Sequence, residues 1–456
     1  MTLRFGTDGV RGVANRELTP ELLLALGRAA GRVLAGPGSS FLVGRDTRLS
    51  GPMVQAALTA GLTAEGVEVI DLGVLPTPGV AWLSAADDRP GAVISASHNP
   101  YTDNGVKFFA AGGRKLDDPA EARLEAELDG IVRSGASAPS AAEDAPVGRV
   151  RTAPEEGRQY ADALVASLPE AALSGLTVVL DCAHGAAYEV APAVYRRLGA
   201  TVHVIHDRPD GCNINAGAGS THPAALQAEV VARQADVGLA FDGDADRVLA
   251  VDAGGELVDG DQLIAVCALD RKQRGRLPDD TVVVTVMANL GFRQAMAAAG
   301  VKLVETDVGD RYVLEALEKG GWSLGGEQSG HVIFRDQATT GDGTRTGLQL
   351  LDVMVRTGRP LAELASVVVR RPQVLRNVVV AEPARFGRDG PVEGDDGLAA
   401  AVAAVRDELG DGGRVLIRAS GTEPVIRVMV EAASAVEAES ATETLCRAVT
   451  EALGAG

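Results

Sequence analysis

The sequence predicts an α/β protein of three α/β units followed by a smaller α+β tail, and two observations carry this prediction. The first is that short apolar runs, typical of buried strands, alternate with helix-like runs such as Met53–Leu62. This alternation is typical of parallel βαβ units. The strand-like runs are Phe41–Gly44, Val67–Leu72, Ala92–Ile94, Leu176–Asp181, Ala200–Ile205, Val237–Asp242, Thr281–Val286 and Lys302–Thr306.

The second observation is a change of pattern after Gly358-Arg359-Pro360. Val374–Val380 and Val425–Val430 alternate like antiparallel strands, and Ala435–Ala452 is rich in Ala and Glu like a helix. The small polar stretch Ser134–Ala142 predicts a loop or linker between the first two units. We expect four domains, which comprise residues 1–150, 151–253, 254–367 and 368–456.

The composition restricts the partners of this protein. The chain has 456 residues, of which 46% are hydrophobic, and its net charge is −19. An acidic surface repels nucleic-acid phosphates, so we expect no nucleic-acid partner. An anionic small substrate would need a local cluster of basic residues.

The compartment is expected to be the cytoplasm. Met1–Asp8 lacks the apolar segment of a signal peptide, and no apolar run approaches the roughly 18 residues of a membrane span. The widely spaced cysteines Cys182, Cys212, Cys267 and Cys446 form neither a metal motif nor a disulfide framework, which favours a reducing compartment. The sequence leaves a homodimer open.

The stretch Ser95-Ala96-Ser97-His98-Asn99-Pro100 places two hydroxyls and an imidazole directly after the apolar run Gly91–Ile94. Pro100 disfavours a helix at Asn99, so these side chains should lie on a loop at the end of a strand. A serine held in this way can be a nucleophile or a phosphate carrier. An ordinary polar turn is the alternative.

The acidic motif Asp242-Gly243-Asp244-Ala245-Asp246-Arg247 follows another apolar strand. Its three carboxylates alternate with small residues and can converge on one hard cation such as Mg²⁺. Ligands of open α/β sheets bind at the carboxyl ends of strands, which favours this interpretation over a solvated acidic turn.

The C-terminal motif runs from Arg418 to Pro424 and is followed by Arg427. Its arginines and the hydroxyls of Ser420 and Thr422 can donate hydrogen bonds to a phosphate, and Gly421 allows a close backbone approach. This is the local basic cluster that the net charge requires. A polar β-turn is the alternative.

Further candidates are weaker when taken alone. The loop Gly325–His331 offers donors and acceptors that suit a sugar ring. Arg11 lies among glycines and could reach a phosphate, and Lys107 could act as a general acid or base. We interpret His184, His203, His206 and His222 as structural, because they lack a paired ligand spacing.

Four motifs occur in the order Ser97–Pro100, Asp242–Arg247, Gly326–His331 and Arg418–Arg427, and together they resemble the α-D-phosphohexomutase family over essentially the whole chain. Further segments resemble the bacterial branch that acts on glucosamine phosphates, namely Phe5–Gly12, Val258–Gln262, Gly326–His331 and Ser420–Pro424. The resemblance implies three similar mixed-sheet α/β domains and a smaller C-terminal α+β domain around a deep central cleft.

The resemblance also implies roles for individual residues. Ser97 would carry a phosphoryl group, and Asp242, Asp244 and Asp246 would bind Mg²⁺ together with that phosphate. The remaining roles concern the substrate and proton transfer. Glu327 and Ser329 would contact the sugar, and Arg247 and His98 would orient the serine phosphate. Lys107, Arg11 and His331 would lie near the transferring group. The phosphate that does not react would be held by Arg418, Ser420, Gly421, Thr422 and Arg427.

The implied activity interconverts glucosamine 6-phosphate and glucosamine 1-phosphate, with glucosamine 1,6-bisphosphate as intermediate and primer, and feeds amino-sugar and cell-wall synthesis. Phosphoryl transfer of this kind needs mainly positioning and charge neutralisation. One residue departs from the pattern: Asp307 in Thr306–Arg311 is acidic where a neutral or basic residue is expected. This departure raises the question whether the Asp307 side chain faces the cleft.

Three alternatives remain at this point. A phosphoglucomutase or phosphomannomutase of the same family would differ only in its contacts with the 2-position of the sugar. An aspartate-nucleophile phosphatase also begins with Asp-Gly-Asp after a strand, although that class usually has Thr or Val at the position of Asp246. A sugar-phosphate sensor would bind its ligand without turnover.

Overall fold

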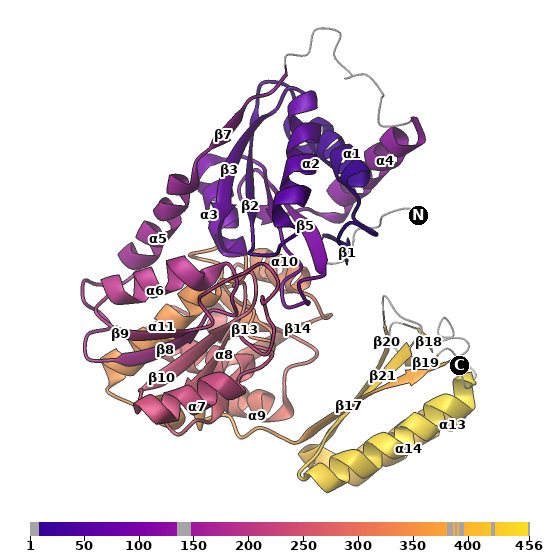
Figure 1. Ribbon diagram of the computed structural model, residues 1–456. Coiled ribbons are helices and arrows are strands. Elements are labelled where there is room, and N and C mark those ends of the chain that lie inside the picture. The colour runs from indigo at the N-terminus through magenta and orange to yellow at the C-terminus, as the bar shows by residue number, and fades with distance from the viewer. Residues whose placement is uncertain are drawn as a thin grey trace. The chain divides into compact units, whose positions relative to one another are not determined.

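The computed structural model describes residues 9–134, 147–380, 386–387, 390–391, 396–420 and 425–454. The chain folds into two compact units (Figure 1). The first unit comprises Met1–Met287 and Gly300–Val367, and the second comprises Ala288–Ala299 and Val368–Gly456. In the parts of the chain that the structure describes, no helix combines the length and apolar character that crossing a membrane requires.

The first unit begins with a seven-stranded mixed sheet of order β1-β5-β4-β2-β3-β7, in which β6 pairs with β5. Strands β4, β2, β3 and β7 are parallel, and β5 runs antiparallel to β1, β4 and β6. The strands are β1 (Val10–Val13), β2 (Ser40–Arg45), β3 (Glu68–Val74), β4 (Gly91–Ile94), β5 (Asp103–Ala110), β6 (Arg114–Lys115) and β7 (Val150–Thr152). The helices are α1 (Pro20–Ala30), which continues as a π-helical turn over Gly31–Ala35, α2 (Gly51–Ala64), α3 (Thr77–Asp87) and α4 (Asp118–Ser134).

A five-stranded mixed sheet follows, of order β12-β11-β10-β8-β9. Its central strand β10 pairs in parallel with β8 and antiparallel with β11. The strands are β8 (Thr177–Asp181), β9 (Thr201–Ile205), β10 (Val237–Phe241), β11 (Val248–Asp252) and β12 (Leu257–Val258). The helices are α5 (Gly157–Ala166), α6 (Ala187–Arg197) and α7 (Ala224–Arg233).

The third sheet of this unit has four strands in the order β14-β13-β15-β16, of which only β16 pairs antiparallel. Its strands are β13 (Thr281–Thr285), β14 (Lys302–Thr306), β15 (Leu324–Gly326) and β16 (Val332–Phe334). The helices are α8 (Gly260–Gln273), α10 (Asp310–Gly320), α11 (Gly343–Thr357) and α12 (Leu361–Ala365).

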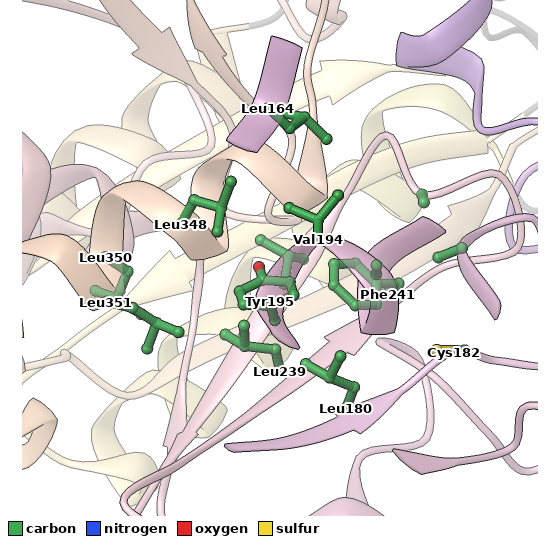
Figure 2. Packing of buried hydrophobic residues seen from close by; sticks show 14 of the residues in the cluster. Leu164, Leu180, Cys182, Val194, Tyr195, Leu239, Phe241, Leu348, Leu350 and Leu351 are labelled. Atoms are coloured by element: carbon green, nitrogen blue, oxygen red, sulfur yellow. The ribbon is translucent and has the colours of Figure 1, made fainter. Parts of the chain in front are cut away.

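One hydrophobic core of the first unit joins its first two sheets to helices that include α8 and α11. It contains Leu42 and Ile70 of the first sheet, Leu180 and Leu239 of the second, and Leu348 of α11. Figure 2 shows side chains of α6, α11 and the second sheet packed around Tyr195. The Tyr195 hydroxyl donates a hydrogen bond of 2.9 Å to the backbone oxygen of Thr344. The core therefore holds the first two sheets and α11 in a defined relation.

The second unit is built on an antiparallel sheet of order β17-β21-β20, against which α14 packs. It includes α9 (Leu290–Ala298), whose first backbone N–H donates to the buried Glu431 carboxylate at 3.1 Å. The other elements are β17 (Gln373–Val379), β18 (Phe386–Gly387), β19 (Gly390–Pro391), β20 (Arg414–Ala419), β21 (Val425–Glu431), α13 (Asp396–Leu409) and α14 (Ala435–Leu453).

The predicted fold class is confirmed: three mixed α/β sheets are followed by an antiparallel sheet with helices. The final helix, expected over Ala435–Ala452, is α14. The predicted linker after Ser134 lies outside the described residues. Strand β7 pairs with β3, so the first sheet extends to Thr152, just past the proposed boundary at 150.

Helices α1 and α2 cross at two glycines. A Cβ atom on Gly27 would lie 2.2 Å from the backbone oxygen of Leu58, and one on Gly61 would lie 2.2 Å from that of Leu24. The close approach of these helices therefore depends on the absence of side chains at both positions.

We expect Gly61→Ala to lower the free energy of unfolding by about 1–3 kcal/mol, because the added methyl group forces the two helices apart. Gly130→Ala in α4 is the control, since no described atom lies within 4 Å of its added Cβ. This control should raise the free energy of unfolding by up to about 1 kcal/mol. Urea unfolding measures both. An equal effect of the two substitutions would contradict the close crossing.

Candidate active site

Three buried carboxylates lie at the carboxyl end of β10. The strand is apolar and buried along its length, so its end delivers Asp242 to the edge of the sheet. The loop then turns through Ala245, which has a left-handed φ of 58°. This turn lets Asp242, Asp244 and Asp246 converge, with one ligand atom from each within 4.8 Å of the others.

Polar groups from other elements contact this triad. The ammonium group of Lys107, on β5, lies 2.9 Å from Asp244 Oδ2 and 3.4 Å from Asp246 Oδ2. The hydroxyl of Thr77, the first residue of α3, donates to Asp244 Oδ2 at 2.6 Å. Lys107 is 2% exposed, so its charge acts on the carboxylates with little screening by solvent. It is thus not the solvated lysine that is usual at the edge of a strand.

The pKa shifts of Asp242 and Asp246 reflect burial and the charges around the triad. Burial raises the pKa of Asp242 well above its ordinary value, and the charges of Asp246 and Asp244 raise it further. Burial also acts to raise the pKa of Asp246, but Lys107 and His331 outweigh it and hold this pKa well below the ordinary range. An added cation would relieve the repulsion that raises the pKa of Asp242.

The donor set of the triad fits a metal ion. Within the described part of the chain, Asp244 Oδ1 and Asp246 Oδ1 are buried and have no hydrogen-bond partner. Unpaired buried carboxylate oxygens are costly, and they are the ligands that hard divalent cations prefer. The triad can therefore hold a divalent cation.

Ser97 lies beside the triad. Its hydroxyl is fully buried and donates to Asp242 Oδ2 at 2.7 Å. Its backbone has a left-handed φ of 52°, a conformation that is uncommon for a residue with a side chain. The backbone N–H of Ser97 donates to Ser95 Oγ at 2.9 Å. The loop after β4 thus directs the Ser97 hydroxyl at the acidic cluster.

A buried ion pair holds this loop, and the sequence pattern did not reveal it. Arg48 donates from Nε to Asp46 Oδ2 at 2.8 Å, and both side chains are fully buried. The guanidinium group also donates to four backbone oxygens of the loop, those of Ser97, Asn99, Pro100 and Asp103. The signal in the sequence was the charged segment Arg45-Asp46-Thr47-Arg48 at the carboxyl end of β2, which is parallel to β4.

Asn215 links the same loop to the second sheet and was also missed. Its amide donates to the backbone oxygens of Ser97 at 2.9 Å and Asn99 at 3.1 Å. Its backbone N–H donates to the oxygen of Ala183, in the loop after β8. A lone asparagine in a glycine-rich loop carries no signal of this role.

His98 faces the arginines of the site. Its Nδ1 lies 3.3 Å from Ser97 Oγ and 3.2 Å from Arg247 Nη1. Burial, together with the charges of Arg247 and Arg11, lowers the pKa of His98 to about 4. His98 is therefore neutral near pH 7 and can accept a hydrogen bond there. Arg11 lies on β1, opposite Gly105 of β5.

His331 also contacts the triad, through Asp246. Its side chain is 2% exposed, and its Nδ1 lies 3.7 Å from Asp246 Oδ2. Its Nε2 accepts a hydrogen bond of 3.0 Å from the N–H of Gly341 and lies 3.3 Å from Asp310 Oδ2. Burial lowers the pKa of His331, but the charge of Asp310 and the contact with Asp246 outweigh it, so the net shift is upward.

Glu327 and Ser329 lie in the turn between β15 and β16. The Ser329 hydroxyl donates to Glu327 Oε2 at 3.3 Å, and the N–H of Gly309 donates to Glu327 Oε1 at 3.2 Å. The side chain of Asp307, the acidic residue that departs from the family pattern, is exposed. The acid that contacts His331 is Asp310, three residues later.

The second unit carries the predicted basic cluster. Arg418 of β20 and Arg427 of β21 are opposite each other in the antiparallel register. Arg427 Nη2 donates to Ser420 Oγ at 3.4 Å. Gly421 and Thr422 lie outside the described residues.

The structure brings most of the predicted site residues of the first unit into one network of contacts. The charge of Arg11 also affects this network, because it helps to lower the pKa of His98. The network consists of Ser97, His98, Lys107, Asp242, Asp244, Asp246, Arg247 and His331 with its neighbour Asp310. Glu327 and Ser329 contact each other in the turn that leads to His331.

Four family models match the chain. They are described as phosphoglucomutase/phosphomannomutase alpha/beta/alpha domain I, domain II, domain III and C-terminal domain, and they match residues 2–133, 158–255, 259–371 and 375–448.

Individual proteins are also similar to this chain. A phosphoglucosamine mutase of Rhodococcus opacus is 56% identical, and the match covers 94% of this chain and 95% of that protein. One of Acidothermus cellulolyticus is 55% identical over 99% of this chain and 96% of its own. A crystal structure of a phosphoglucomutase/phosphomannomutase family protein from Burkholderia thailandensis matches with a TM-score of 0.80 and 26% identity, over 99% and 98% of the two chains.

We expect the imidazole of His98 to titrate near pH 4 rather than at its ordinary pKa, because its neutral form is favoured by burial and by two arginines. NMR of the side chain in the metal-free, unphosphorylated protein measures this. The unfolded state takes up the proton first on acidification, so the stability linked to neutral His98 is lost as pH falls from about 6.5 to about 4. His98→Gln should flatten this loss, and the exposed control His222→Gln should leave it unchanged.

We expect Arg48→Met to lower the free energy of unfolding by about 3–5 kcal/mol, because it leaves the Asp46 carboxylate buried without its cation. Arg89→Met is the control, since Arg89 forms a partly exposed pair with Asp87. Such a pair contributes roughly 0–1 kcal/mol. Urea unfolding measures both, and a small effect at Arg48 would show that the loop does not depend on this ion pair.

Proposed function

Because this chain belongs to the phosphoglucomutase/phosphomannomutase family, we propose that it acts as a phosphoglucosamine mutase. The reaction interconverts glucosamine 6-phosphate and glucosamine 1-phosphate. The observation that carries the proposal is the buried hydroxyl of Ser97, which lies 2.7 Å from Asp242 of the acidic triad. The choice of sugar within the family rests on the relatives named phosphoglucosamine mutase, which match nearly the full chain.

We assign Mg²⁺ to the triad, held by one oxygen from each of Asp242, Asp244 and Asp246 together with the phosphate on Ser97. The unpaired oxygens of Asp244 and Asp246 support this assignment. When bound, the ion supplies charge neutralisation for the transferred phosphoryl group.

In the first half-reaction, the bond between phosphorus and Ser97 Oγ breaks while a bond forms between phosphorus and O1 of glucosamine 6-phosphate. The proton of the O1 hydroxyl leaves, and Ser97 Oγ regains a proton to become a hydroxyl. The family resemblance assigns proton transfer to Lys107, Arg11 and His331. The contacts of Lys107 and His331 with the triad support a place for both beside the transferring group.

In the second half-reaction, glucosamine 1,6-bisphosphate presents its other phosphate, and a bond forms between phosphorus and Ser97 Oγ while the bond from phosphorus to O6 breaks. Ser97 Oγ loses its proton, O6 gains one to become a hydroxyl, and glucosamine 1-phosphate leaves. Arg418, Ser420, Gly421, Thr422 and Arg427 hold the phosphate that does not react. Their arginines are permanent, bidentate donors, which suits this task.

Other side chains orient the groups that react. Glu327 and Ser329 contact the sugar hydroxyls in this proposal. Arg247 and neutral His98 orient the phosphate of Ser97, and the 3.2 Å contact between these two side chains supports a common role. An aspartate-nucleophile phosphatase would have no need of the Ser97 loop, which the buried Asp46–Arg48 pair holds in place.

The matched ranges of the family models support four domains close to 1–150, 151–253, 254–367 and 368–456. We further propose that the enzyme works in the cytoplasm and that its product feeds amino-sugar and cell-wall precursor synthesis. This proposal follows from the reaction named for the relatives.

We expect peptide mass spectrometry to find phosphate on Ser97 and Ser97→Ala to lower mutase activity to the assay background, because the phosphoryl group then has no carrier. Ser440→Ala, an exposed serine of α14, is the matched control and should keep full activity. A fully active Ser97→Ala protein would overturn the proposal.

The substrate is tested by comparing glucosamine, glucose and mannose 6-phosphates, each primed with the corresponding bisphosphate. We expect kcat/KM to be highest for the glucosamine compound by about tenfold or more, because a site that hydrogen-bonds a substrate NH discriminates against analogues without it. A preference for glucose or mannose would assign the chain to another activity of the family. Binding without any product would indicate a sensor.

A further inference from the structure

The loop after β14 brings an unassigned carboxylate to the edge of the candidate metal site. Asp310 begins α10, and its Oδ2 lies 3.3 Å from Nε2 of His331. The same oxygen contacts the ammonium group of Lys115, on β6. The side chain of Asp310 is 14% exposed and that of Lys115 is 10% exposed, so both charges are largely shielded from solvent. The resemblance that located the other site residues assigns no role to either.

Both nitrogens of the His331 imidazole have polar neighbours. Nε2 lies 3.0 Å from the Gly341 nitrogen and 3.3 Å from Asp310 Oδ2, whereas Nδ1 faces Asp246 at 3.7 Å. Without a proton, Nε2 accepts from the Gly341 N–H; with a proton, it donates to Asp310 instead. A Cβ atom on residue 341 would lie 2.4 Å from Nε2, so only glycine lets the backbone approach the ring this closely. The ring therefore has one orientation available between two carboxylates.

We propose that Asp310 is a positioning residue of the metal site, which fixes His331 and through it the carboxylate of Asp246. The inference rests on the proposed metal role of the triad. Asp246 Oδ2 is occupied by its contacts with Lys107 and His331, while Asp246 Oδ1 has no hydrogen-bond partner among the described residues and only a longer contact of 3.8 Å with Arg247 Nε. The contacts on Oδ2 thus fix the carboxylate with Oδ1 left as the ligand atom. Groups that orient metal ligands in this way commonly tune metal affinity.

The proposal links the metal site to the packing of the first sheet against segments that flank the third sheet of the first unit. Lys115 belongs to the first sheet, whereas Asp310 begins α10 and His331 directly precedes β16. The next residue of α10, Arg311, reinforces the same contact through ion pairs with Asp118 and Glu121 of α4. The orientation of Asp246 therefore depends on how these two parts of the unit pack together.

The test measures Mn²⁺ binding by the full-length protein, with electron paramagnetic resonance to count free Mn²⁺. We expect Asp310→Asn to weaken Mn²⁺ binding about tenfold, and Lys115→Met to weaken it less but in the same direction. Glu315→Gln is the control, because this exposed residue of α10 contacts Arg311 rather than Asp310. It should leave Mn²⁺ binding unchanged. Thermal unfolding of each variant shows whether its fold is retained.

A double-mutant cycle with His331→Asn distinguishes positioning from a general effect on structure. If Asp310 acts through His331, Asp310→Asn should add little to the loss that His331→Asn already causes. In mutase assays, Asp310→Asn should lower kcat at limiting metal and recover with excess metal, while KM for the sugar phosphate stays constant.

The outcomes separate this inference from the function on which it rests. Equal Mn²⁺ binding by wild type and Asp310→Asn, or full additivity with His331→Asn, would overturn the positioning role alone. A wild-type protein that binds no Mn²⁺, or binds it equally well after Asp244→Asn, would overturn the metal assignment of the triad and the inference with it.

Discussion

Repulsion among three buried carboxylates is the constraint on which the rest of this site depends. Asp242, Asp244 and Asp246 converge within 4.8 Å in a region from which solvent is largely excluded. Like charges at this distance in a low dielectric are costly unless cations or donors surround them. The groups that do so come from far apart in the sequence: Lys107 from β5, Thr77 from α3 and His331 from the position just before β16. The site is therefore a property of several sheets together.

The loop of Ser97 shows how the same unit fixes a reactive group without help from a ligand. Arg48 and Asn215 both donate to the backbone oxygens of Ser97 and Asn99, Arg48 from the loop after β2 and Asn215 from the loop after β9. The left-handed backbone of Ser97 would be disfavoured in a free loop, and these hydrogen bonds stabilise it. Preorganisation of this kind matters for phosphoryl transfer, in which positioning provides much of the rate.

The sequence was informative wherever a motif was local. Asp242 to Asp246 sit at alternate positions after an apolar strand, and Ser97 follows another, so the residue pattern alone places both at strand ends. Thr77, Asn215 and Asp310 could not be found in this way, because each is a single polar residue that becomes part of the site only through packing. Arg48 lies in a charged segment at a strand end, but only the structure shows that this segment holds the Ser97 loop. Lys107 was recognised, but its burial was not, since the strand pattern around it does not reveal which face is covered. Helix α9 lies within the range 254–367 along the chain, whereas its contacts in the structure group it with the second compact unit, where Glu431 accepts a hydrogen bond from its first turn.

The continuous core of the first unit bears on how such a protein can evolve. Side chains of the first two sheets and of α11 are buried in it, and α11 approaches Tyr195 so closely that a Cβ on Gly347 would lie 2.1 Å from the tyrosine hydroxyl. A sheet transplanted from a distant homologue would bring mismatched surfaces into this core and lose stability. We therefore expect the first two sheets and α11 to be inherited together, with recombination between relatives tolerated best outside them.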